Sequence, residues 1–245
     1  MDERMERILE DFENNALGLD DTFQFRCRTC GKCCKNRHDL ILTTRDLYNI
    51  AGYFDRTMDY IVERYCDRFI GDTSRIPIVR LRPSGPEQAC PLLRNKRCLV
   101  HSVKPGICAI YPLGRGLKME KTENGTAIPE VLEPTYFMQT DACGARDQTH
   151  TLGGWLEEFG IPIEDDFYPL WTEMIADLSK MFRGLESRKT PEGLMVLIRE
   201  FVFTALYICY DPKRDLIPQF QNNIALLKNT MPKFEMESVK LAGGV

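Results

Sequence analysis

The sequence predicts an α+β protein in which a loop-rich cysteine half, with short strands and helices, precedes a helical C-terminal half. Nine of the ten cysteines lie from Cys27 to Cys143, among glycines, prolines and short β-prone stretches. Beyond them, apolar residues recur at helical spacing over long runs. We therefore expect a cysteine-cluster metal-binding region over residues 1–150 and a helical region over residues 151–245 packed on it.

Short elements are expected throughout the first half. Apolar residues at helical spacing predict an acidic amphipathic helix over residues 2–16. Thr43 followed by Asp46 resembles a helix start and predicts a helix over 44–54, whereas Pro77 suggests an edge strand in the run 76–81. The other expected elements are a strand at 40–42, a helix at 57–68, a hairpin at 90–100 with its turn at 94–96, a tight loop at 105–116 and a β-prone stretch at 126–138.

Four helices are expected in the second half. Thr151 can cap a helix that runs to Phe159, and the strong apolar periodicity of residues 163–182 predicts a second helix. Thr190 as N-cap, with Pro191 at the first helical position, predicts a third helix that ends near residue 210. The last helix is expected over 216–229.

Charge and hydropathy predict the cellular compartment of the protein. The 245 residues carry a net charge of −4, so the chain as a whole is no polyanion binder. The charged N-terminus lacks the features of a secretory signal, and Arg199 and Glu200 interrupt the most apolar stretch, which therefore reads as a buried helix. We expect a cytoplasmic protein without membrane association. Clustered cysteines in the reducing cytosol are thiols that serve as metal ligands or redox groups.

The first cysteine group predicts a metal centre. Cys27, Cys30 and Cys33 follow a C-x2-C-x2-C spacing, with which ferredoxin loops wrap a [4Fe–4S] cluster. Gly31 lets the backbone turn close to the metal. Because neighbouring side chains diverge, Cys33 and Cys34 are expected to reach different iron atoms or two separate sites, or one of them is not a ligand.

A second cysteine group is more widely spaced. Its four thiols suit a second four-thiolate site, or one of them completes the first cluster and three remain for an open site. Ten lysines and arginines against two glutamates between residues 75 and 121 indicate a solvated basic face, a stabilising surround for metal-bound thiolates, or an anionic partner. His101 has a spacing compatible with ligation, whereas Cys66 and Cys209 are expected in the core. The second group consists of Cys90, Cys98, Cys108 and Cys143.

The order of these motifs resembles the YkgJ-type cysteine cluster family, whose domain is described as zinc- or iron-chelating. The resemblance rests on the first group, on Cys90-Pro91, on Cys98 with Pro105 and Cys108, on Tyr111-Pro112 and on Cys143-Gly144, and it covers residues 23–160. It implies that the eight motif cysteines bind metal. The family includes flagellin lysine N-methylases, but a shared domain does not imply methylation.

The sequence favours an iron–sulfur protein with a [4Fe–4S] cluster and a redox or enzyme-supporting role. A zinc-stabilised interaction module and a lysine N-methylase-like enzyme that uses S-adenosylmethionine are the alternatives. A protein partner or substrate is expected, rather than a membrane or a nucleic acid. No catalytic residue can be named, and the sequence contains no P-loop, dinucleotide-binding or serine-hydrolase motif.

Overall fold

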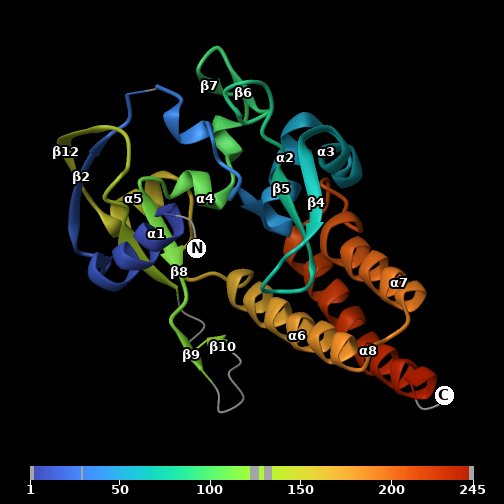
Figure 1. Ribbon diagram of the computed structural model, residues 1–245. Helices are drawn as coiled ribbons and strands as arrows, with labels where there is room; N and C mark the ends of the chain where they lie inside the picture. Colours follow the sequence, from blue (N-terminus) through green and yellow to red (C-terminus); the bar gives the residue numbers. More distant parts are fainter. Residues whose placement is uncertain (1–2, 29, 122–126, 130–133, 243–245) are drawn as a thin grey trace. The chain divides into compact units, whose positions relative to one another are not determined.

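The computed structural model describes residues 3–28, 30–121, 127–129 and 134–242 (Figure 1). The chain forms two compact units, Met1–Leu40 with Pro83–Asp165 and Ile41–Arg82 with Asp166–Val245. Helices and small antiparallel sheets are both present, which confirms the α+β class, and the described elements after residue 151 are all helical. The predicted division at residue 150 differs from this arrangement, because Ile41–Arg82 belongs to the second unit.

The first unit is built from short elements joined by loops. Its two larger pairings are the three-stranded sheet β1-β11-β8 and the pair β12-β2. The hairpin β6-β7 and the pair β10-β9 complete it. The elements are α1 (Glu3–Asn14), β1 (Ala16–Leu17), β2 (Thr22–Arg26), the 3₁₀ turn η1 (Lys32–Cys34), β6 (Leu93–Arg94), β7 (Arg97–Cys98), the 3₁₀ turn η2 (His101–Val103), α4 (Gly106–Ala109), β8 (Leu113–Gly116), β9 (Met119–Lys121), β10 (Ala127–Pro129), β11 (Thr135–Met138), β12 (Ala145–Thr151) and α5 (Leu152–Glu158).

An aromatic core fixes the loop that follows α4. Phe23 and Phe25 alternate inward along β2 and meet the Trp155 ring edge-to-face, with centroids 5.5 and 5.8 Å apart. The indole N–H of Trp155 donates to the Ile110 carbonyl at 3.2 Å. Because the Thr151 hydroxyl accepts from the Gly154 N–H, α5 begins where predicted and presents Trp155 to this loop.

The pairing of β8 with β11 leaves no room for a side chain at Gly114. Gly114 lies opposite Phe137, and a Cβ at this position would be 2.1 Å from the Phe137 ring. We expect Gly114→Ala to lower the free energy of unfolding of the first unit by about 1–3 kcal/mol, because the ring must move. Denaturant titration measures this loss. Gly193→Ala is the control, since a Cβ there meets nothing within 4 Å; equal unfolding curves for the two variants would contradict the prediction.

The second unit combines a three-stranded sheet with helices. The strand order is β3-β5-β4, and all pairings are antiparallel. Thr43 and Asp46 form the predicted capping box at the start of α2. The elements are β3 (Ile41–Leu42), α2 (Thr44–Phe54), α3 (Met58–Tyr65), β4 (Cys66–Ile70), β5 (Pro77–Leu81), α6 (Tyr168–Ser187), α7 (Glu192–Phe203), the π-helical turn η3 (Thr204–Ile208) and α8 (Leu216–Ala242).

Several local predictions for this unit were wrong. Strand β5 is central rather than an edge, and it tolerates Pro77 because proline is its first residue. Thr190 does not cap α7, since its hydroxyl donates to the Leu185 carbonyl at the end of α6. Helix α8 continues past residue 229 through Pro232. Within the described residues, no helix is long and apolar enough to cross a membrane.

Candidate metal centre

The predicted metal ligands and the remaining cysteines lie in different units. All ten lie in the described part of the chain and all are thiols. The eight predicted ligands belong to the first unit, whereas Cys66 and Cys209 belong to the second. Cys66 is buried, as expected of a core residue, but Cys209 is exposed at the end of η3, so its predicted place in the core was wrong. The apolar residues that precede Cys209 misled the prediction, because the helix ends just before it.

The first cysteine group folds around a tight turn. Gly31 adopts a φ of 70°, a left-handed conformation that glycine accepts without strain, and η1 follows it at once. The turn brings the Sγ atoms of Cys33 and Cys34 to 3.9 Å. The expected divergence of these neighbours was therefore wrong. Two thiolates on one tetrahedral ion lie about 3.8 Å apart when the metal–sulfur bonds are about 2.3 Å, so the pair suits shared ligation.

The second group meets the first through backbone pairing. The Cys90 N–H donates to the Cys34 carbonyl at 2.8 Å, and the Asn36 N–H donates to the Gln88 carbonyl at 2.9 Å. The Cys90 sulfur accepts the backbone N–H groups of Leu92 and Leu93, but burial dominates and raises the pKa of this thiol to about 11. Such amide donors stabilise a thiolate once a metal replaces the proton.

Hairpin β6-β7 and helix α4 position the next two cysteines. Cys98 ends β7 opposite Leu93, and its sulfur accepts the Val100 N–H. Burial raises the pKa of the Cys98 thiol. Cys108 lies in α4, where its N–H donates to the Pro105 carbonyl at 2.8 Å. The structure confirms the hairpin with its turn at Asn95 and Lys96, both of which have positive φ.

Cys143 approaches from a distant segment. Its Sγ atom lies 3.9 Å from that of Cys30, the same separation as in the first pair. Tyr111 holds it in place: the Tyr111 hydroxyl accepts the Cys143 N–H at 2.6 Å and donates to the Cys143 sulfur at 3.3 Å. The Tyr111 ring in turn packs edge-to-face on Phe25 of the aromatic core, with centroids 5.8 Å apart.

Electrostatic interactions relate Cys33 to several of the other cysteines. Cys33 interacts with cysteines of the first group, of the Cys90–Cys98 segment and of the C-terminal side of the unit. The pKa of Cys33 is raised, because its thiol is hydrogen-bonded to Cys34 and is partly buried. Among the described residues, no three histidine, cysteine or acidic side chains stand within ligating distance of one point. The geometry thus consists of two close pairs, with further thiols around them.

Two cations line the group from inside the unit. The Arg37 guanidinium is buried, donates from Nε to Asp39 at 2.6 Å and interacts electrostatically with Cys33 and Cys108. Lys104 lies over the Phe159 ring at 4.0 Å and interacts with Cys27, Cys98 and Cys108, among others. Burial lowers the pKa of Lys104, and the nearby thiolates oppose that shift. These positive charges offset the negative charge of metal-bound thiolates.

The sequence alone indicates no role in the site for Tyr111, Arg37 or Lys104. For Tyr111, the only local signal in the sequence is the Tyr111-Pro112 dipeptide. That dipeptide does not show which sulfur the Tyr111 hydroxyl contacts. His101 is exposed in η2, and no contact with another described residue assigns it to the site.

We expect Tyr111→Phe to weaken metal binding by about 10–100-fold, because the change removes the hydroxyl that orients Cys143 and keeps the ring that packs on Phe25. Competition with a chelator, followed by the metal that remains in the protein, measures the loss. Tyr136→Phe is a matched control in β11. A variant that retains metal as tightly as the original chain would rule out this positioning role.

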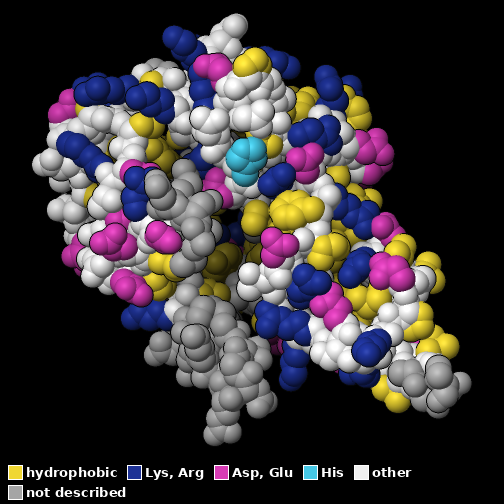
Figure 2. Space-filling model, viewed as in Figure 1, with side chains coloured by type: hydrophobic (Ala, Val, Ile, Leu, Met, Phe, Trp, Pro, Cys, Tyr) yellow, Lys and Arg dark blue, Asp and Glu magenta, His cyan; other side chains and the backbone are white. Residues whose placement is uncertain are grey.

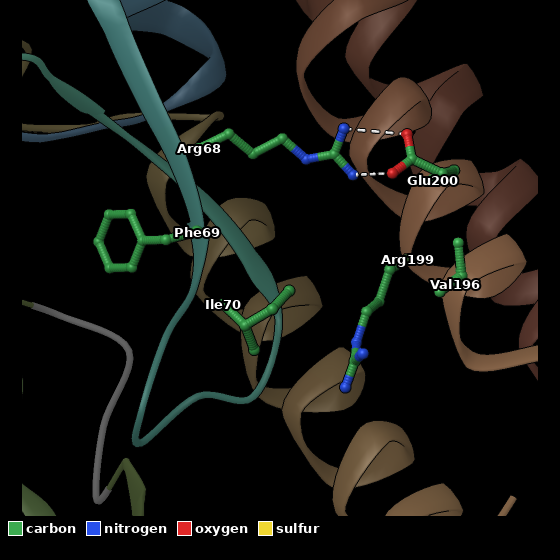
Figure 3. A pocket seen from close by; sticks show the side chains of 6 residues that line it. All are labelled: Arg68, Phe69, Ile70, Val196, Arg199 and Glu200. Atoms are coloured by element: carbon green, nitrogen blue, oxygen red, sulfur yellow. Dashed lines mark hydrogen bonds and ion pairs between the residues drawn. The ribbon is translucent and has the colours of Figure 1, made fainter. Parts of the chain in front are cut away.

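An open cavity of about 280 Å³ lies in the second unit (Figure 3). Figure 3 shows the Arg68 guanidinium facing the Glu200 carboxylate, and one of their two hydrogen bonds is 2.9 Å long. Arg199, also in the lining, pairs with Glu192 at 3.2 Å and with Glu186 at 3.6 Å. Both arginines therefore have carboxylate partners within this unit.

Comparisons with known proteins agree with the site. Residues 26–131 match the family model "CxxCxxCC: Putative zinc- or iron-chelating domain", so this part of the chain is similar to that family, as the motif order indicated. Seven of the eight predicted ligands lie within the match, and Cys143 lies beyond it. The chain is also similar to the uncharacterized protein MJ0661 of Methanocaldococcus jannaschii, with 31% identity over 88 residues, which are 36% of this chain and 44% of that protein. No solved structure matches.

Proposed function

We propose that the first unit holds an iron–sulfur cluster, [4Fe–4S], with a redox or enzyme-supporting role. The observation that supports it best is that cysteines from separate segments meet: the Cys143 sulfur lies 3.9 Å from that of Cys30, and the Cys90 N–H donates to the Cys34 carbonyl at 2.8 Å. Thiolates are the ligands that iron–sulfur clusters use, and the C-x2-C-x2-C spacing is the ferredoxin spacing. When bound, such a cluster accepts and releases one electron.

The surroundings fit a cluster as well as the donors do. A metal cluster with four thiolates is anionic, and Arg37 and Lys104 place positive charge beside it without serving as ligands. The thiols are half-buried, apart from Cys27, which is exposed. Partial burial limits solvent access to the iron and tunes its potential. The amide donors to Cys90 and the hydroxyl donor to Cys143 would orient those ligands and stabilise their charge.

A zinc-stabilised interaction module is the second candidate, and one observation favours it. The two sulfur pairs, Cys30 with Cys143 and Cys33 with Cys34, each have the separation that a single tetrahedral zinc ion requires. Zinc bound by four thiolates would hold the loops without redox chemistry. The two candidates differ in colour, because zinc has a filled d shell and does not absorb visible light. They also differ in inorganic sulfide, which only the iron–sulfur cluster contains.

Metal analysis of anaerobically purified protein tests the proposal. We expect a brown protein with about four iron and four sulfide per chain, the content of one [4Fe–4S] cluster. Iron, zinc and acid-labile sulfide are measured on the same sample, alongside the visible spectrum. A colourless protein with one or two zinc ions and no sulfide would replace the iron–sulfur proposal by the zinc module.

A further inference from the structure

A basic surface lies beside the cysteine group. It consists of four exposed cations, which we call the basic rim: Lys32, Arg94, Lys96 and Arg97. Lys32 directly precedes Cys33, and Arg97 directly precedes Cys98, so both flank sulfurs of the group. The turn and the hairpin that carry these cations are adjacent, since a Cβ on Gly31 would lie 3.7 Å from the Leu93 side chain.

The positive charge of this surface is not balanced locally. Residues 26–37 and 83–104 contain nine lysines and arginines and one acidic residue, Glu87, although the whole chain has a net charge of −4. Glu87 pairs with Lys35 at 2.6 Å. Among the described residues, no ion pair involves a member of the basic rim. In Figure 2, dark blue Lys and Arg side chains lie around the upper end of the first unit, where Figure 1 draws the hairpin β6-β7.

The positive charges on the hairpin β6-β7 destabilise the pairing of its two strands. Arg94 and Arg97 are directly opposite each other across the two strands. Like charges in such a pair are destabilising. The turn residues Asn95 and Lys96 both have positive φ, as a type I′ turn requires, so the hairpin projects the charges outward on a short, well-defined element. A partner of opposite charge outside the chain would relieve the repulsion between Arg94 and Arg97.

We propose that the basic rim docks an acidic electron-transfer protein, which passes one electron to the metal centre beside it. The partner is oxidised by one electron, the cluster is reduced by one electron, and no bond forms or breaks. Opposite charges would steer the partner onto the surface next to the sulfurs and raise its rate of association. The electron-transfer half of this inference rests on the proposed iron–sulfur function, whereas the docking half is measured independently.

The chemistry of the surface favours a protein over a nucleic acid. Proteins that bind single strands stack bases on aromatic side chains, but residues 26–47 and 83–110 contain no phenylalanine, tyrosine or tryptophan. An apolar side chain, Leu99, is instead 39% exposed next to the hairpin. Cations around an apolar contact suit the acidic rim and apolar centre of a protein interface.

Charge reversal on the hairpin tests the proposal. The test variant is Arg94→Glu with Arg97→Glu, which exchanges one like-charge pair for another and leaves the local repulsion the same in kind. The matched control is Lys180→Glu with Lys233→Glu, two exposed lysines of the second unit, because it changes the net charge equally. The probe is a plant-type [2Fe–2S] ferredoxin of net negative charge. Its dissociation constant is measured by surface plasmon resonance at low and high salt, and its reduction of the cluster is followed by visible bleaching.

We expect the ferredoxin to bind the original chain and the control alike, and to bind the hairpin variant about tenfold more weakly or worse, with the difference lost at high salt. Equal binding to the hairpin variant and the control would overturn the docking surface. Tighter binding of a single-stranded oligonucleotide than of ferredoxin would replace the partner by a nucleic acid. Iron and sulfide are measured on every sample beforehand, so a failure of the iron–sulfur proposal is detected without the partner.

Discussion

Cys33→Ser is expected to abolish metal binding by the first unit. Its sulfur is 3.9 Å from that of Cys34, and its charge also acts on thiols of the second cysteine group. A serine hydroxyl is a poor ligand for iron or zinc at neutral pH, since soft thiolates are preferred. The affinity should fall by more than the 10–100-fold that loss of an outer-shell partner costs. Metal per chain after desalting measures the effect.

Two cysteines of the second unit serve as controls. Cys209→Ser should leave both metal content and stability nearly unchanged, because Cys209 is exposed. Cys66→Ser should also leave the metal content unchanged, yet lower the free energy of unfolding by about 1–3 kcal/mol, since it introduces a hydroxyl at a buried site. If Cys33→Ser retained as much metal as Cys209→Ser, the assignment of Cys33 as a metal ligand would be wrong.

The sequence predicts the ligand group from a local signal, and which of these thiols bind metal stays a prediction. Cys33 and Cys34 lie in one 3₁₀ turn, and the spacing of the first four cysteines alone indicates two or more thiolates on one side of a loop. Cys98 also lies on a hairpin whose turn residues are recognisable. In both cases the residues that fix the geometry are within a few positions of the ligand, so the chain specifies them without tertiary information.

The contacts of Cys143 could not be predicted in the same way. Cys30 and Cys143 are far apart in the sequence, and they meet because β2 pairs with β12 and because Tyr111 is held on the aromatic core. The same limit applies to the domain division. Residues 41–82 follow the first cysteine turn directly, but they belong to the second unit, where the Thr44 hydroxyl donates to the Leu206 carbonyl. Such choices depend on which surfaces bury the most apolar area, and local patterns do not reveal them.

The cysteine segments contain little regular structure of their own, and this has a consequence for metal removal. Around the ligands the first unit offers a three-residue 3₁₀ turn, a hairpin of two-residue strands and a four-residue helix. Elements this short are marginal in water without further support. Thiolate–metal bonds contribute on the order of 10–16 kcal/mol in small zinc peptides, far more than these few hydrogen bonds. The second unit, by contrast, has helices of up to 27 residues and no predicted ligand.

Chelation is therefore expected to loosen one unit and spare the other. Amide hydrogen exchange should rise by about tenfold or more in residues 27–37 and 90–108, because local opening no longer breaks metal bonds. The helices α2, α6 and α7 should keep their protection. The two tryptophans give an independent measure, since Trp155 lies in the first unit and Trp171 in the second. Trp155→Phe leaves Trp171 as the sole fluorescent reporter, and its emission should not respond to the chelator. Uniform exchange throughout both units, or a response from Trp171, would show that the metal supports the whole chain and that the two units do not unfold separately.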